Sequence, residues 1–231
     1  MAESKKPQAD EAEHGAYFPS VYSLGQYVPA KSDFDGGEKD TVTEGPKKIL
    51  AVMVDERYLP VEGEALFSTG NHPIETLVPL MHLSEAGYEI EIATPSGLMG
   101  KFEYWAFPKE DDAVKDAFET LLPKIRNPKS LADVVKNELG ADSEYAAIFI
   151  PGGHGAMISL QHDENVGAAL RTGRRPLRHH PLPRSGCAAR GRRERLLTVR
   201  RLLDRGVPRL SRRGRQRRDR LPAGQAHLGA R

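Results

Sequence analysis

Arginine is distributed very unevenly along this 231-residue chain. Residues 171–231 contain 20 arginines, no lysine and three acidic residues, a net charge of +17. Residues 1–170 contain 14 basic and 29 acidic residues, a net charge of −15. The arginine-rich segment has neither the 3.6-residue period of a helix nor the two-residue period of a strand. A folded core is therefore expected only in the first 170 residues, and a disordered tail is predicted for 171–231.

The first part of the chain has the pattern of an α/β domain. Apolar and amphipathic runs alternate, which predicts a parallel sheet with helices on both faces. Residues 1–46 are expected to be an irregular N-terminal arm, and 47–170 an incomplete α/β domain. The predicted strands are KKILAVMV (47–54), YEIEIATP (88–95) and the start of EYAAIFIPGGHG (144–155). The predicted helices lie at 72–87, 113–122 and 130–139, the last with Asn127-Pro128 as its N-terminal cap.

Two loops follow the ends of predicted strands, where parallel sheets bind ligands. One is TGNHPIE (69–75), which carries Glu75, and the other is PGGHGA (151–156), with Gly152 and Gly153. Two glycines in a turn can expose backbone N–H groups to an oxyanion, although a Gly-Gly pair more often serves only the turn. Glu75 could equally do no more than offset a helix dipole. His72 and His154 are expected to be hydrogen-bonded loop residues.

Several longer segments resemble one protein family. DERYLP (55–60), FSTGNHPIETLVPL (67–80), GLMGKFEYWAFP (97–108) and DSEYAAIFIPGGHGA (142–156) resemble the bacterial heat-shock chaperone and glyoxalase III group of the ThiJ/PfpI superfamily. The resemblance covers roughly residues 15–170. It implies a flavodoxin-like fold, a homodimer, and cofactor-independent conversion of methylglyoxal to lactate by a cysteine nucleophile. Deglycation of proteins and nucleotides, and the holding of unfolded proteins, are also implied.

The resemblance also assigns roles to individual residues. It places Glu75 beside the nucleophilic thiol and makes Gly152 and Gly153 the oxyanion donors. Some members of the family bind a metal through two histidines and a glutamate. The glutamate corresponds to Glu89 here, but the histidine positions hold Ser84 and Leu121. We therefore expect neither a metal site nor a cofactor.

The family's nucleophile motif, Leu-Cys-His-Gly-Pro-Ala-Ala, is absent from the chain. Codons for residues 176–188 can be chosen so that the same bases, read one base later, give Arg-Phe-Val-Ile-Thr-Leu-Cys-His-Gly-Pro-Ala-Ala. Codons for residues 220–228 can likewise be chosen so that the same shift gives Gly-Tyr-Leu-Pro-Gly-Lys-Leu-Thr-Trp, another segment of the family. Our hypothesis is that the chain leaves the family's reading frame near residues 171–175. GC-rich DNA read out of frame would also explain arginines without lysines.

Under this hypothesis the single cysteine, Cys187, is not the nucleophile. Ala188 follows it instead of histidine, and it lies in no predicted strand. The codons of the family's cysteine would be shared by Leu182 and Pro183. His179 and His180 are not expected to bind a metal, because adjacent histidines rarely both reach one ion.

Three functions therefore remain open. The first is a glyoxalase III-like enzyme that is inactive because it has lost its nucleophile. The second is a non-catalytic holdase that uses exposed apolar surface. The third is non-specific binding of nucleic acid through the arginine-rich tail. One cysteine and the lack of a signal sequence or membrane span predict a cytoplasmic protein.

Overall fold

The computed structural model describes residues 3–34, 36 and 40–172. Cys187, His179 and His180 lie outside these residues. So do the predicted disordered tail beyond residue 172 and most of the proposed frame boundary. None of the described helices is both long and apolar enough to cross a lipid bilayer.

The central sheet is parallel, as the sequence predicts. Its strand order is β7-β6-β3-β8. The strands are β3 (Lys48–Val52), β6 (Glu89–Thr94), β7 (Lys129–Ser130) and β8 (Tyr145–Phe149). The three strands predicted from apolar runs are confirmed, and their order β6-β3-β8 is the 2-1-3 order with which a flavodoxin-like sheet begins.

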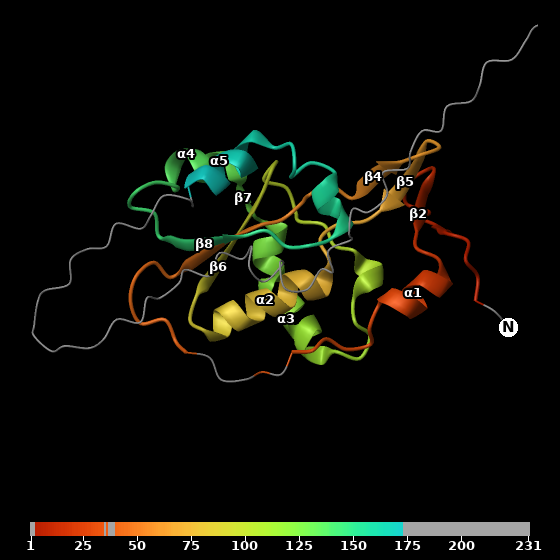
Figure 1. Ribbon diagram of the computed structural model, residues 1–231, viewed down its shortest axis with the longest axis horizontal. Helices are drawn as coiled ribbons and strands as arrows, with labels where there is room; N and C mark the ends of the chain where they lie inside the picture. Colours follow the sequence, from red (N-terminus) through yellow and green to blue (C-terminus); the bar gives the residue numbers. More distant parts are fainter. Residues whose placement is uncertain (1–2, 35, 37–39, 173–231) are drawn as a thin grey trace, which may run out of the picture. The chain divides into compact units, whose positions relative to one another are not determined.

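Helices cover both faces of this sheet (Figure 1). They are α2 (Pro73–Glu85) and α3 (Asp112–Arg126) on one face, and α4 (Leu131–Asn137) and α5 (Glu164–Thr172) on the other. Strand β3 supplies both layers, because Ile49, Ala51 and Met53 pack toward α2 and α3, and Leu50, Val52 and Val54 pack toward α4 and α5. Burial on both faces explains why this strand reads as an unbroken apolar run.

The predicted cap of the fourth helix is wrong. Asn127 ends α3, and α4 begins after Ser130. A residue before proline is disfavoured in helical geometry, so Pro128 keeps Asn127 out of a helix. The chain instead becomes extended, and Lys129 and Ser130 pair with the end of β6 as β7.

The N-terminal arm is more regular than the sequence predicts. It contains β1 (Gln8–Ala9), β2 (Ala16–Phe18) and α1 (Val21–Tyr27). These strands join β5 (Ala65–Ser68) and β4 (Tyr58–Val61) in a second sheet of order β1-β2-β5-β4. An ion pair of 2.8 Å between Arg57 and the buried Asp10 ties the arm to this sheet.

Candidate active site

The structure brings together the two loops that the sequence singled out. The loop before α2 meets the loop after β8 through two backbone hydrogen bonds. The N–H of His72 donates to the carbonyl of Gly152 at 2.9 Å, and the N–H of Gly155 donates to the carbonyl of Gly70 at 3.0 Å. The glycine loop follows the carboxyl end of β8. The loop before α2 follows β5 of the second sheet, and its Asn71 reaches Val54 just beyond the carboxyl end of β3. This edge is the usual position of a site in a parallel sheet.

Glu75 is held at the start of α2. Pro73 occupies the first turn of the helix, and the side chain of His72 caps it by accepting the N–H of Glu75 at 3.3 Å. The Glu75 carboxylate then lies directly against the Cα of Gly152, where a Cβ would overlap with it. The capped helix end therefore places the exposed Glu75 carboxylate beside the glycine turn.

Close packing against backbone requires glycine at residue 153, whereas a side chain at residue 152 would meet only the Glu75 side chain. Gly153 has a φ of +120°, and a Cβ there would lie 2.5 Å from both the carbonyl oxygen of Gly70 and the backbone nitrogen of His72. Within the described part of the chain, the N–H groups of Gly152 and Gly153 have no acceptor. Hydrogen-bond donors without an acceptor are what an oxyanion site needs.

A buried asparagine anchors the first loop to the end of β3. The side chain of Asn71 accepts the N–H of Val54 at 3.1 Å and donates to the carbonyls of Val54 and Lys101 at 2.9 and 2.6 Å. The backbone carbonyl of Asn71 also accepts the N–H of Glu103 at 3.0 Å. The loop that carries the candidate site is thus attached to the core by buried hydrogen bonds.

Sequence reasoning missed Glu103, which lies beneath the site. Its side chain is 0% exposed, and its Oε1 is 2.8 Å from Nδ1 of His154. The same oxygen accepts the hydroxyl of Thr69 at 2.6 Å and the N–H of His154 at 3.1 Å. Burial alone would raise the pKa of Glu103, but these hydrogen bonds outweigh it and the pKa is lowered. Glu103 is therefore a buried carboxylate ion.

His154 is the partner of that carboxylate. The hydrogen bond to Glu103 raises the pKa of His154, burial opposes the rise, and the charges of Glu103 and Glu75 add to it. The ring also packs edge-on against Phe67, with 5.4 Å between the ring centroids. The prediction of a hydrogen-bonded loop histidine is confirmed, with a charged partner that the sequence did not reveal.

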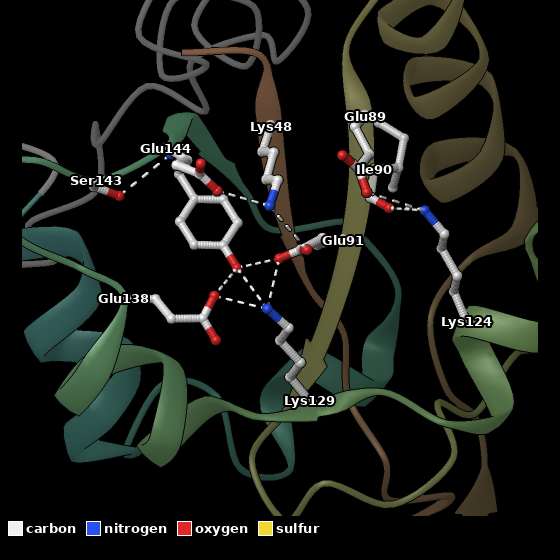
Figure 2. Close-up of polar contacts among 10 residues, drawn as sticks. Lys48, Glu89, Ile90, Glu91, Lys124, Lys129, Glu138, Ser143 and Glu144 are labelled. Atoms are coloured by element: carbon white, nitrogen blue, oxygen red, sulfur yellow. Dashed lines mark hydrogen bonds and ion pairs between the residues drawn. The ribbon is translucent and has the colours of Figure 1, made fainter.

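The metal ligands that some members of the family use do not fit this chain. Glu89 faces Lys124, with 3.9 Å between the carboxylate and the ammonium group, and Lys124 also donates to the carbonyl of Ile90 at 2.7 Å (Figure 2). Serine and leucine stand at the two histidine positions. No group of three or more His, Cys, Asp and Glu residues among those described could hold a metal ion.

A second charged cluster joins β6, β7 and the start of β8. Lys129 donates to Glu91 at 2.9 Å and to Glu138 at 2.7 Å, and the Tyr145 hydroxyl contacts both carboxylates (Figure 2). Burial and these two carboxylates raise the pKa of Tyr145. Tyr145 begins β8, whereas the candidate site follows the end of this strand, so the cluster stabilises the sheet and is not part of the site.

Known proteins resemble most of this chain. Protein/nucleic acid deglycase HchA of Escherichia coli O1:K1 is 59% identical over 171 residues, which are 74% of this chain and 60% of that protein. The protein of the same name from Escherichia coli O157:H7 is 58% identical over 168 residues, 73% of this chain and 59% of that protein. The chain therefore spans about 60% of the length of the curated relatives it matches.

No family model matches the chain. The crystal structure of glyoxalase III from Candida albicans is similar with a TM-score of 0.43 and 21% sequence identity, over 54% of this chain and 51% of that one.

Proposed function

We infer that this chain, a homologue of the HchA deglycases over most of its length, is the first part of a thiol-dependent glyoxalase and deglycase whose nucleophile it does not encode. The observation that supports this proposal best is the Glu75 carboxylate beside the Gly152–Gly153 turn. A carboxylate and free N–H donors at the carboxyl end of a parallel sheet are two of the three parts that such chemistry needs.

The chemistry assigns a task to each part. In the intact enzyme, a thiolate adds to the aldehyde carbon of methylglyoxal, and the oxygen of that carbonyl becomes an alkoxide. In this proposal Glu75 exchanges a proton with the thiol or the substrate, and the N–H groups of Gly152 and Gly153 stabilise the oxyanion. A proton then moves between the two carbons through an enediol, and water releases lactate and the free thiol.

The third part, the thiol, is missing under this proposal. Cys187 lies outside the described residues, and the codons of the family's cysteine are shared by Leu182 and Pro183. Without a nucleophile no covalent intermediate forms. The chain as printed is therefore expected to convert no measurable methylglyoxal.

The test compares the printed chain with a gene from which one base is removed just upstream of codon 176. The shifted frame encodes the family's cysteine, and this product should form lactate from methylglyoxal. Glu75→Gln in the shifted product should lower its rate about 100-fold or more, as expected when a general acid or base is lost. Lactate formation by the printed chain that disappears with Cys187→Ser would refute the proposal. Sequencing of the gene and its transcript then tells a sequencing error from a real mutation.

A non-catalytic holdase is the second candidate. The observation in its favour is the outer edge of β8, which in the described part of the chain has no neighbouring strand. A soluble, monodisperse sample that suppresses the aggregation of an unfolded client protein would support this function. Sedimentation of the same sample tests the homodimer that the family resemblance implies. Loss of nucleic-acid binding at physiological salt on deletion of 173–231 would test the third candidate.

A further inference from the structure

Burial of the Glu103 carboxylate is unfavourable for the stability of the fold. Its side chain is fully buried, and its second oxygen, Oε2, has no hydrogen-bond partner among the described residues. A buried carboxylate oxygen without a partner destabilises a fold. The three donors to Oε1 come from Thr69 and His154. Two of the three donors to Oε1 belong to His154, so the structure indicates that Glu103 serves to hold His154.

The ring of His154 is held on one side and open on the other. Nδ1 lies 2.8 Å from Glu103, so the proton on this nitrogen is directed at the carboxylate. Nε2 is at the opposite edge of the ring, and 54% of the side chain is exposed. Since Phe67 fixes the ring plane, Nε2–H is presented in one direction. A buried acid that orients an exposed imidazole is a recurring arrangement at functional sites.

The charges around this ring favour its protonated form. Two charged groups face the His154 ring. They are the buried Glu103, which contacts Nδ1, and Glu75 of α2. The N–H groups of Gly152 and Gly153 directly precede it and have no acceptor in the part of the chain described. An imidazolium and two N–H groups without acceptors, on three consecutive residues, are donors of the kind that bind an anionic oxygen.

We propose that His154, held by Glu103, binds the carboxylate of a small 2-hydroxy acid together with the N–H groups of the Gly152–Gly153 turn. This inference rests on the proposed function, for which it is the site of the product carboxylate. It names a binding group that does not depend on the thiol, so the chain as printed has the site even if it cannot turn over substrate.

The neighbouring carboxylate of Glu75 predicts the direction in which the affinity for an anion changes in two variants. Glu75 lies on Gly152 and carries the same charge as the ligand, so it opposes binding of an anion. Glu75→Gln should therefore tighten binding, whereas His154→Gln should weaken it. If His154 had only a structural role, Glu75→Gln and His154→Gln would not change the affinity for the anion in opposite directions.

The experiment is an NMR titration of the full printed chain, labelled with ¹⁵N, with sodium lactate. Lactamide, which has the same shape without the charge, is the control ligand. Lactate should shift the signals of Gly152, Gly153 and His154, and it should bind about tenfold or more tightly than lactamide, the effect of one charge-assisted hydrogen bond. His154→Gln should remove this difference. In the unmodified chain, lactate affinity should fall as pH rises through the pKa of His154.

Three results would overturn the proposal. The first is that lactate does not bind to the chain. The second is that lactate and lactamide bind equally well, and the third is that His154→Gln leaves the affinity for lactate unchanged. The pH titration uses no variant, so a folding defect in a variant cannot hide the answer. These results are independent of turnover. A shifted-frame product that forms no lactate would refute the proposed function and leave the binding result intact.

Discussion

The Glu75 carboxylate occupies the space in which a side chain on residue 152 would stand, so Glu75 keeps its position only while residue 152 is glycine. The relationship joins the first turn of α2 to the turn after β8, which are 77 positions apart in the sequence. The Glu75 carboxylate can therefore lie at this place only if residue 152 has no side chain, whatever the turn contributes to catalysis.

Gly152→Ala should displace the Glu75 carboxylate at a cost below about 1 kcal/mol, because that carboxylate is the movable end of an exposed side chain. Gly153→Ala should cost more, about 1–3 kcal/mol, because a Cβ there meets backbone atoms and φ is positive. The free energy of unfolding in urea measures both effects. The control is Gly140→Ala, because nothing lies within 4 Å of a Cβ at residue 140. Equal stability of Gly153→Ala and Gly140→Ala would contradict the prediction.

Asp111 should make the fold sensitive to acid. Its Oδ2 accepts the N–H and the hydroxyl of Ser32 at 2.7 and 2.6 Å, and its Oδ1 caps α3 at Val114. Burial alone would raise the pKa of Asp111, but these hydrogen bonds lower it below the ordinary value of 3.8. A carboxyl group whose pKa is lowered by folding stabilises the folded state above its unfolded pKa and loses this effect as pH falls through its folded pKa.

Asp111→Asn should therefore cost about 1–3 kcal/mol at neutral pH, the usual value of hydrogen bonds to a charged group. Below about pH 4 the difference from the unmodified chain should shrink, because Asp111 itself becomes protonated. Chemical unfolding at a series of pH values measures this. Asp112→Asn is the control, since that side chain is 90% exposed and its pairing with Lys115 should contribute little. A constant difference at all pH values would contradict the prediction.

The cluster around Tyr145 predicts a second acid-sensitive contribution (Figure 2). Burial raises the pKa values of Glu91 and Glu138, and hydrogen bonds from Tyr145 and Lys129 outweigh burial and lower them. Tyr145→Phe removes one of these donors and should cost about 1–2 kcal/mol at neutral pH, with a smaller cost below about pH 4. Lys129→Met should cost more, because it leaves Glu138 without its cation and Glu91 with only the longer pairing of 3.6 Å to Lys48.

The matched control for this cluster is Tyr27→Phe. The same hydroxyl is removed there from a side chain that is 79% exposed. Its unfolding free energy should be unchanged within about 0.5 kcal/mol, as for most surface substitutions. If Tyr145→Phe is equally neutral, the hydroxyl does not stabilise the two carboxylates in solution.

The sequence predicts the central sheet well and the second sheet poorly. Strands β3, β6 and β8 carry apolar runs because both faces of a parallel sheet are buried. The hairpin of β4 and β5 gave no comparable pattern, since its strands are half-buried and its turn depends on two residues with positive φ, Gly63 and Glu64. Glutamate is not a residue that signals such a turn.

The candidate site shows the same division. The position of the glycine turn could be predicted, because it follows the carboxyl end of the parallel strand β8. Glu75 lies at the same edge as expected, although its loop follows β5 of the second sheet. Glu103 could not, because a single glutamate has no period or spacing. Its one signal is an acidic residue between Phe102 and Tyr104, within an aromatic run. Only the fold shows that this residue is buried beneath His154.

The edge of β8 is where the chain should associate with itself or with a client. In the described residues β8 pairs only with β3, and an unpaired strand edge is a template for another strand. Ala147, in the middle of β8, is exposed. A lysine at this position should slow aggregation on heating several-fold, because a charge on an edge strand opposes strand pairing. Light scattering measures the rate, and the free energy of unfolding should not change.

The control for the edge is Ala141→Lys. Ala141 is also exposed, but it lies in the turn before β8, so the variant has the same composition and charge without a lysine on the edge. If both lysine variants slow aggregation equally, net charge is the cause and the edge is not the surface of association. If only Ala147→Lys slows it and also weakens protection of a client protein, the edge of β8 is the holdase surface. If Ala147→Lys slows self-association but leaves client protection intact, the holdase reading must rest on a different apolar surface.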